Sequence, residues 1–181
     1  ATRTTPQLFI TPEMLDWWRD NGVEKCIFGL RVPAVAQQQL AVLTDKEMPI
    51  ECYFPVYLTG DVLAQVRSAY AMADGFPVGK MWLDFETTPG WNAIANMRLS
   101  LEESVSHGLP VGIYTGCWWW VGQLGNPTDF SEFDIWNANY HPRSDRLWFD
   151  DNPYGGWAKA VRVISPSRSR ARVAVLFQFQ S

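Results

Sequence analysis

The sequence predicts an α/β fold, an abbreviated TIM-like (β/α) barrel in which helices are missing from the C-terminal third. Short β-branched or aromatic runs alternate with amphipathic stretches, which is the pattern of parallel βαβ units. These runs indicate roughly seven or eight strands, a number that favours a barrel over an open sheet. The chain has 181 residues, whereas a full barrel typically takes about 250, so some helices must be absent.

Capping and turn residues define the first elements. Thr11 and Pro12 open a helix with an N-cap side chain and a proline at the first position, and the helix ends near Asn21-Gly22. A buried strand follows over 25–30. The next elements are expected in this order: a helix over 35–43, a strand over 50–58, a helix from 61 to about 74, a strand over 79–86, a helix from near 91 to 106 and a strand over 111–115.

Helical signals thin out after residue 115, which is where the missing helices are expected. The segments 133–140 and 172–179 have strand-like composition, but the segment between them shows no helical period. No repeat, linker or low-complexity tract divides the chain, so residues 1–181 are expected to form a single domain.

Composition excludes several classes of protein. With 47% apolar and 19% charged residues the chain can bury a core, and no apolar run approaches the length of a membrane span. The net charge of −4 does not indicate a protein that binds nucleic acid. Cys26, Cys52 and Cys117 lack CxxC spacing and are expected to be buried free thiols. His107 and His141 have no partner at ligand spacing, so metal binding is not expected. No organic cofactor is implied either.

Asp84 and Glu86 form the sharpest chemical feature. Acids at i and i+2 of a strand share one face, with Cα atoms about 6.6 Å apart. Apolar residues 81–83 precede the pair and the loop 87–90 follows it, which places both acids at the carboxyl end of a buried strand. Burial of neighbouring carboxyls separates their pKa values, which is what cleavage of a glycosidic bond requires. The alternative is a solvated pair at a strand end.

Several segments, taken in order, resemble the glycoside hydrolase family 25 lysozymes over roughly residues 10–180. The segments are Asp16-Trp17 with Gly22 and Cys26–Arg31, Tyr53-Phe54, Trp82-Leu-Asp-Phe-Glu86, Gly108-Leu-Pro-Val-Gly-Ile-Tyr-Thr115, Ile135-Trp-Asn-Ala-Asn-Tyr140 and Phe177-Gln-Phe179. The family usually has His where Phe54 stands. Its barrel also lacks late helices, so the resemblance accounts for the length of the chain.

The resemblance implies hydrolysis of the β-1,4 bond between N-acetylmuramic acid and N-acetylglucosamine in peptidoglycan. Glu86 would be the general acid, and Asp84 would stabilise positive charge or orient the N-acetyl group of the substrate. The sugar would be held by Tyr53, Tyr114, Trp136, Tyr140 and Gln178. The partner would be peptidoglycan or a related polysaccharide. We therefore expect a monomer that is extracellular, phage-encoded (as an endolysin) or directed at the cell wall, although no signal peptide is visible.

Trp118, Trp119 and Trp120 follow the strand that ends at Thr115, and three adjacent indoles cannot all lie in the core. We expect Trp119 to be exposed as a sugar-stacking surface beside the mouth of the barrel, because pyranose faces pack on indole. The alternative is that Trp118 and Trp120 are core residues and Trp119 packs under a loop.

One segment departs from the family. Its first strand usually ends in Asp-x-Ser, whose Asp lines the active site, but Gln7–Thr11 contains no acid. Either another carboxylate replaces it, with Asp150-Asp151 as candidates, or an upstream segment is missing, or activity is altered. Two rival functions follow: a catalytically silent glycan-binding or structural barrel, and a glycosidase for another polysaccharide such as chitin.

Overall fold

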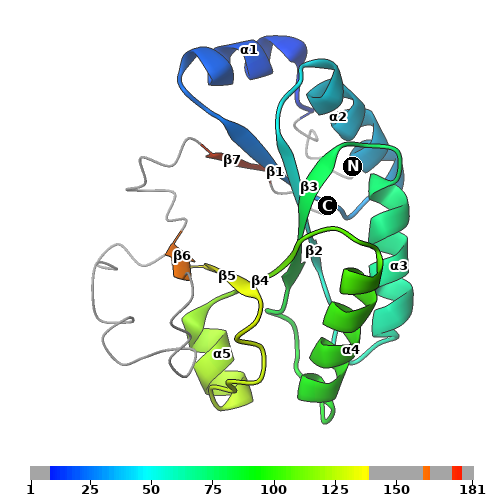
Figure 1. Cartoon of the computed structure of the whole chain (residues 1–181), viewed down its shortest axis with the longest axis vertical. Helices are drawn as coiled ribbons and strands as arrows, with labels where there is room; N and C mark the ends of the chain where they lie inside the picture. Colours follow the sequence, from blue (N-terminus) through cyan, green and yellow to red (C-terminus); the bar gives the residue numbers. More distant parts are fainter. Residues whose placement is uncertain (1–8, 139–160, 164–172, 177–181) are drawn as a thin grey trace, which may run out of the picture.

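The computed structural model describes residues 9–138, 161–163 and 173–176, the last two ranges by their backbone (Figure 1). Helices and strands alternate along these residues. The elements are α1 Pro12–Asp20, β1 Lys25–Gly29, α2 Pro33–Asp45, β2 Ile50–Pro55, α3 Val62–Ala73, β3 Val78–Asp84, α4 Ala93–Ser106, β4 Val111–Thr115, α5 Cys117–Leu124, β5 Asp134–Asn137, β6 Val161–Val163 and β7 Val173–Leu176.

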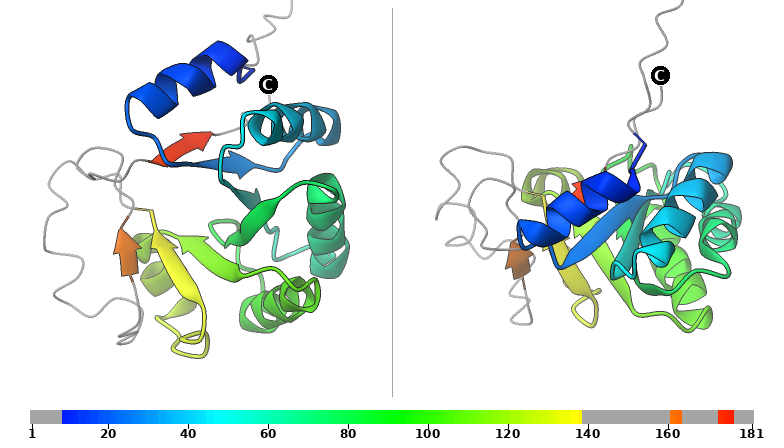
Figure 2. Two further views of the ribbon diagram at one scale, coloured as in Figure 1. Left: turned by 45° about the horizontal axis from the view of Figure 1, so that its top comes forward. Right: turned by 90° about the horizontal axis from the view of Figure 1, so that it is seen from above.

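The seven strands form one parallel sheet in the order β6-β5-β4-β3-β2-β1-β7. Figure 2 shows that the sheet curves around a common centre, with α2, α3 and α4 on its outer side. β6 and β7 stand at the two ends of the order, so the described strands form an open arc. The predicted fold class, an abbreviated α/β barrel, is confirmed.

Local sequence explains where the helices begin. Thr11 Oγ1 accepts a hydrogen bond from the backbone N–H of Met14 at 3.3 Å, as expected of an N-cap residue. Asp61 caps α3 in the same way, through the N–H of Ala64 at 3.0 Å. α5 was not predicted, because its run of apolar and aromatic residues has no polar face from which a helical period can be read.

No helix follows α5 within the part of the chain that the structure describes. Residues 139–160 and 164–172, where further helices could lie in sequence, are outside the described residues.

The strands separate two apolar clusters, because successive side chains point to opposite faces of a sheet. The larger cluster lies between the sheet and the helices and includes Met81, Leu83 and Phe85 of the β3 segment. The smaller cluster lies on the other face of the strands, inside the arc. Its members are Ile27, Tyr53, Trp82, Tyr114, Trp136 and Ala138. The three cysteines are buried, as expected of free thiols.

Candidate active site

Four aromatic rings from neighbouring strands fill the inside of the arc. Tyr114 meets Trp136 edge-on with ring centroids 4.6 Å apart, and Trp82 meets Trp136 at 5.8 Å. Tyr53 lies 6.3 Å from Tyr114. All four rings are buried, so they form a packed floor beneath the carboxyl ends of the strands.

Two glycines make room for this floor. A Cβ on Gly112 would lie 2.4 Å from the Trp82 ring, and a Cβ on Gly29 would lie 2.8 Å from the Tyr53 ring. Any larger residue at either position would therefore collide with an aromatic side chain. Gly112, the second glycine of the Gly108–Thr115 motif, thus has a packing role.

The two acids lie on the same face of the β3 segment: Asp84 is level with Tyr114, its register partner on β4, and Glu86 lies two residues further along. Asp84 follows Trp82 on the inner face of the strand, while Leu83 and Phe85 point outward into the larger core. Asp84 Oδ1 accepts a hydrogen bond from the backbone N–H of Glu86 at 3.2 Å. Asp84 is only 8% exposed, whereas Glu86 is partly open to solvent.

Burial raises the pKa of both carboxyls. The pKa of Asp84 rises to about 7, first because it is desolvated and then because the Glu86 charge is near, while Arg31 partly offsets the rise. Desolvation also raises the pKa of Glu86, and the backbone N–H of Gly116 partly offsets it. The raised pKa values favour a proton shared within the pair at higher pH than in free carboxyls, and such a pair can supply both an acid and a base.

A third side chain, that of Trp118, lies next to the pair at Gly116. A Cβ on Gly116 would lie 2.4 Å from Trp118 Nε1 and 2.8 Å from Glu86 Oε1, so both groups pack over the same glycine. Glu86 Oε1 is shielded from solvent there. The indole of Trp118 thus forms one wall beside the Glu86 carboxyl.

The prediction that Trp119 is the exposed stacking ring is wrong. Trp119 is 3% exposed, and its Nε1 donates a hydrogen bond to the carbonyl of Thr87 at 2.9 Å. Trp118 is the exposed indole of the three, at 55%, and Trp120 is buried. The reason is that the three residues lie on the helix α5, whose inner face carries Trp119 and Trp120.

The structure gathers some of the other predicted sugar-binding residues and not others. Tyr53, Tyr114 and Trp136 lie together in the floor, with their rings covered, and direct contact with a sugar stays a prediction. Tyr140 and Gln178 lie outside the described residues, as do the candidate replacement acids 150–151.

Within the described residues, no strand beside β1 corresponds to the family's first strand and its acid. A strand has two hydrogen-bonding edges, and those of β1 are taken by β2 and β7. Residues 9–10 of the corresponding stretch form no strand, and Ile10 donates its N–H to Gln39 on α2. Among the described strands, both edges of β1 are therefore occupied.

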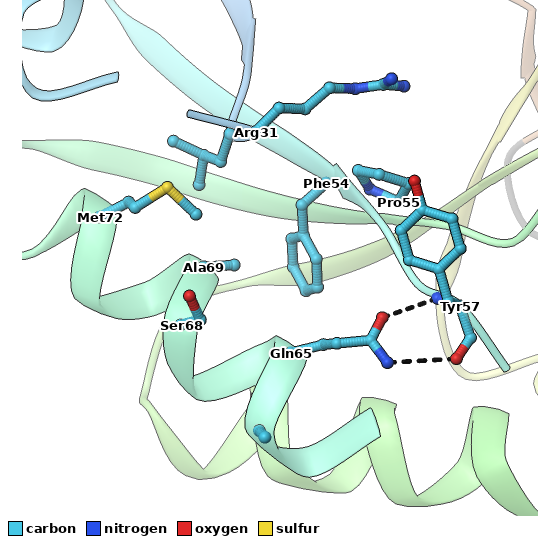
Figure 3. A pocket seen from close by; sticks show the side chains of 10 residues that line it. Arg31, Phe54, Pro55, Tyr57, Gln65, Ser68, Ala69 and Met72 are labelled. Carbon is cyan, nitrogen blue, oxygen red and sulfur yellow. Dashed lines mark hydrogen bonds between the residues drawn. The ribbon is translucent and has the colours of Figure 1, made fainter. Parts of the chain in front are cut away.

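A surface hollow of about 340 Å³ lies on the α3 side of the same edge of the sheet, and neither acid lines it (Figure 3). It lies between the carboxyl ends of β1 and β2 and the helix α3, with Phe54 at its centre. Pro55, in its lining, is the register partner of Asp84. Arg31 also lines it and extends away from α3, and it is the cation that lowers the pKa of Asp84. Sequence reasoning missed Arg31, although a charged residue directly after a buried strand is a usable signal.

The described ranges, 9–138, 161–163 and 173–176, hold neither a metal-binding cluster nor a membrane-spanning helix. They contain no group of three or more His, Cys, Asp or Glu side chains placed to hold a metal ion. No helix within these ranges has the length and apolar character needed to cross a bilayer.

Fold and site together define a truncated parallel (β/α) barrel with a desolvated carboxylate pair at the carboxyl ends of its strands. The chain is similar to three proteins of Dictyostelium discoideum named "Probable GH family 25 lysozyme" 4, 3 and 2. Identity is 28% over 135 residues with number 4, 27% over 109 with number 3 and 27% over 111 with number 2. The matches cover 70%, 56% and 58% of this chain, respectively.

The resemblance to glycoside hydrolase family 25 is thereby confirmed: the chain has a domain similar to that family. The matched segment spans 62%, 22% and 51% of the length of relatives 4, 3 and 2, respectively. No family model and no solved structure matches the chain.

Proposed function

We propose that this domain is a glycoside hydrolase of the lysozyme type, which cleaves the β-1,4 bond between N-acetylmuramic acid and N-acetylglucosamine in peptidoglycan. The observation that carries the proposal is the Asp84–Glu86 pair, whose two pKa values are raised at the carboxyl edge of the sheet. The similarity to proteins named lysozymes supports the same chemistry. Such an enzyme would act outside the cell or at a cell wall.

Glu86 is the proposed general acid because it is the more accessible of the two carboxyls. Its proton passes to the glycosidic oxygen as the C–O bond breaks, and positive charge develops on the sugar ring. Water then adds to the sugar carbon and returns a proton to Glu86. Asp84, held by the Glu86 backbone N–H, stabilises the developing charge or orients the N-acetyl group.

The test is release of reducing ends from purified peptidoglycan, with products identified by mass spectrometry. Glu86→Gln keeps the shape of the side chain but removes its proton chemistry. Glu102→Gln makes the same change on the exposed surface of α4 and serves as the matched control. Turnover that survives Glu86→Gln unchanged would sink the proposal.

A second candidate, a catalytically silent glycan-binding barrel, is favoured by one observation. The acid that the family places on its first strand is absent from 7–11, and β7 occupies the edge of β1 where a first strand could pair. Binding of peptidoglycan without any new reducing ends over a long incubation would support this second candidate. A panel of defined oligosaccharides, chitin fragments included, would identify the polysaccharide.

A further inference from the structure

Three large aromatic rings are exposed in the segments that follow β2, β3 and β4: Tyr57 and Trp91 on loops, and Trp118 in the first turn of α5. Trp91 is fully exposed, and Tyr57 and Trp118 are each more than half exposed. Because these segments begin at the carboxyl ends of neighbouring parallel strands, they lie at the same edge of the sheet as Asp84 and Glu86.

Thr87 joins the β2–α3 loop and helix α5 to the β3–α4 loop. Its hydroxyl donates to the carbonyl of Val56 at 2.7 Å and accepts from the N–H of Leu58 at 3.4 Å. Its carbonyl accepts from Trp119 Nε1 at 2.9 Å. One residue of the β3–α4 loop therefore fixes both the β2–α3 loop and the start of α5.

Further contacts hold the loops that carry Tyr57 and Trp91. The Gln65 amide accepts from the N–H of Tyr57 at 2.7 Å and donates to its carbonyl at 3.1 Å (Figure 3). Next to Trp91, Gly90 lies so close to Thr59 that a Cβ would come within 3.0 Å of its Cγ2. The loops are thus held by backbone contacts, and the exposed rings are left available to a ligand.

We propose that Tyr57, Trp91 and Trp118 form a stacking rim for a glycan chain that crosses the Asp84–Glu86 pair. This rests on the proposed function, since it assigns the binding surface of the same site. Pyranose faces stack on aromatic rings, and rings on fixed segments lose little entropy when they do so. Single-stranded nucleic acid also stacks on aromatic rings, but it requires a cationic groove. Here the rings flank two acids on a chain of net charge −4.

The test measures binding in the Glu86→Gln background, where turnover cannot consume the ligand. The probes are a β-1,4-linked N-acetylglucosamine hexamer, followed by titration calorimetry, and insoluble peptidoglycan, followed by co-sedimentation. We expect Trp91→Ala and Trp118→Ala each to raise Kd by about three- to tenfold. Trp17→Ala is the matched control, because Trp17 is 61% exposed on α1, outside the rim segments, and should leave Kd unchanged.

The outcomes separate the rim from the proposed hydrolysis. Unchanged affinity in both rim variants, or equal losses in Trp17→Ala, would overturn the rim, as would a parent that binds neither glycan. Wild-type protein that releases no reducing ends, together with loss of affinity in the rim variants, would support the rim and contradict hydrolysis. Tighter, rim-dependent binding of a single-stranded DNA oligonucleotide would overturn the glycan assignment.

Discussion

The two ends of the barrel interior carry charged side chains on the same face of the strands but differ in how these charges are compensated. At the amino end, Glu51 accepts from Lys25 Nζ at 2.5 Å and from Trp82 Nε1 at 2.7 Å. At the carboxyl end, Asp84 and Glu86 lie two residues apart and both pKa values are raised. A compensated charge stabilises the fold, whereas a desolvated like-charged pair costs stability and is typical of functional sites.

This difference between the two ends is tested most directly by the same Glu→Gln substitution at each end of the barrel interior. Glu86→Gln should lower the rate of reducing-end release by about 10²- to 10⁴-fold, because it removes the proton donor. Glu51→Gln should leave that rate within a few-fold but lower the free energy of unfolding by about 1–3 kcal/mol, because Lys25 loses its ionic partner. Kinetics and urea denaturation of both variants measure the two effects. Similar losses of activity in the two variants would contradict the comparison.

Asp84→Asn tests how the Asp84 carboxyl makes the free energy of unfolding depend on pH. The folded pKa of Asp84, about 7, lies above the unfolded value of 3.8. The folded state therefore binds the Asp84 proton more tightly than the unfolded state does. The stabilisation that this proton gives the fold is lost as pH rises from about 4 through 7. Over this range the wild-type free energy of unfolding should fall by on the order of 2–4 kcal/mol relative to Asp84→Asn. Urea denaturation at several pH values checks this, and parallel pH profiles would contradict it.

Gly112→Ala tests the floor beneath the site. The added Cβ would lie 2.4 Å from the Trp82 ring, which is held by Glu51 on one side and has Lys80 Nζ 4.2 Å above its centroid. Because the ring cannot shift freely, we expect a loss of about 1–3 kcal/mol in the free energy of unfolding. Thermal and urea denaturation measure it.

Gly116→Ala makes the same change further along the chain, at the mouth, and should have the smallest effect on stability. Its Cβ would displace the Trp118 indole or the Glu86 carboxyl, both of which can move toward solvent. We expect a free energy of unfolding within about 1 kcal/mol of wild type, and kcat/KM lowered by about tenfold through a misplaced acid. A stability loss equal to that of Gly112→Ala would show that the mouth is packed as tightly as the floor.

Much of this arrangement could be predicted from sequence because it depends on local pattern. Strand alternation put Asp84 and Glu86 on one face, and a cap and a proline placed the start of α1 at Thr11. The exposure of Trp118 could not be read in this way. It depends on the helix α5 and on the open space over Gly116, and both come from tertiary packing.

The pairing of β7 with β1 could not be predicted from the sequence either, because it joins segments almost 150 residues apart. No turn or spacing rule connects them, and the hydrophobic pattern is the same for any neighbour a buried strand might have. The role of Arg31 next to Asp84 likewise depends on which strands lie side by side.

Thr87 has a kinetic consequence. Since its hydrogen bonds already join the β2–α3 loop and α5 to the β3–α4 loop, a ligand that arrives at these described segments meets a surface fixed before binding. Encounter would then be limited by diffusion and orientation, and differences in affinity between ligands would lie mainly in how long each one stays.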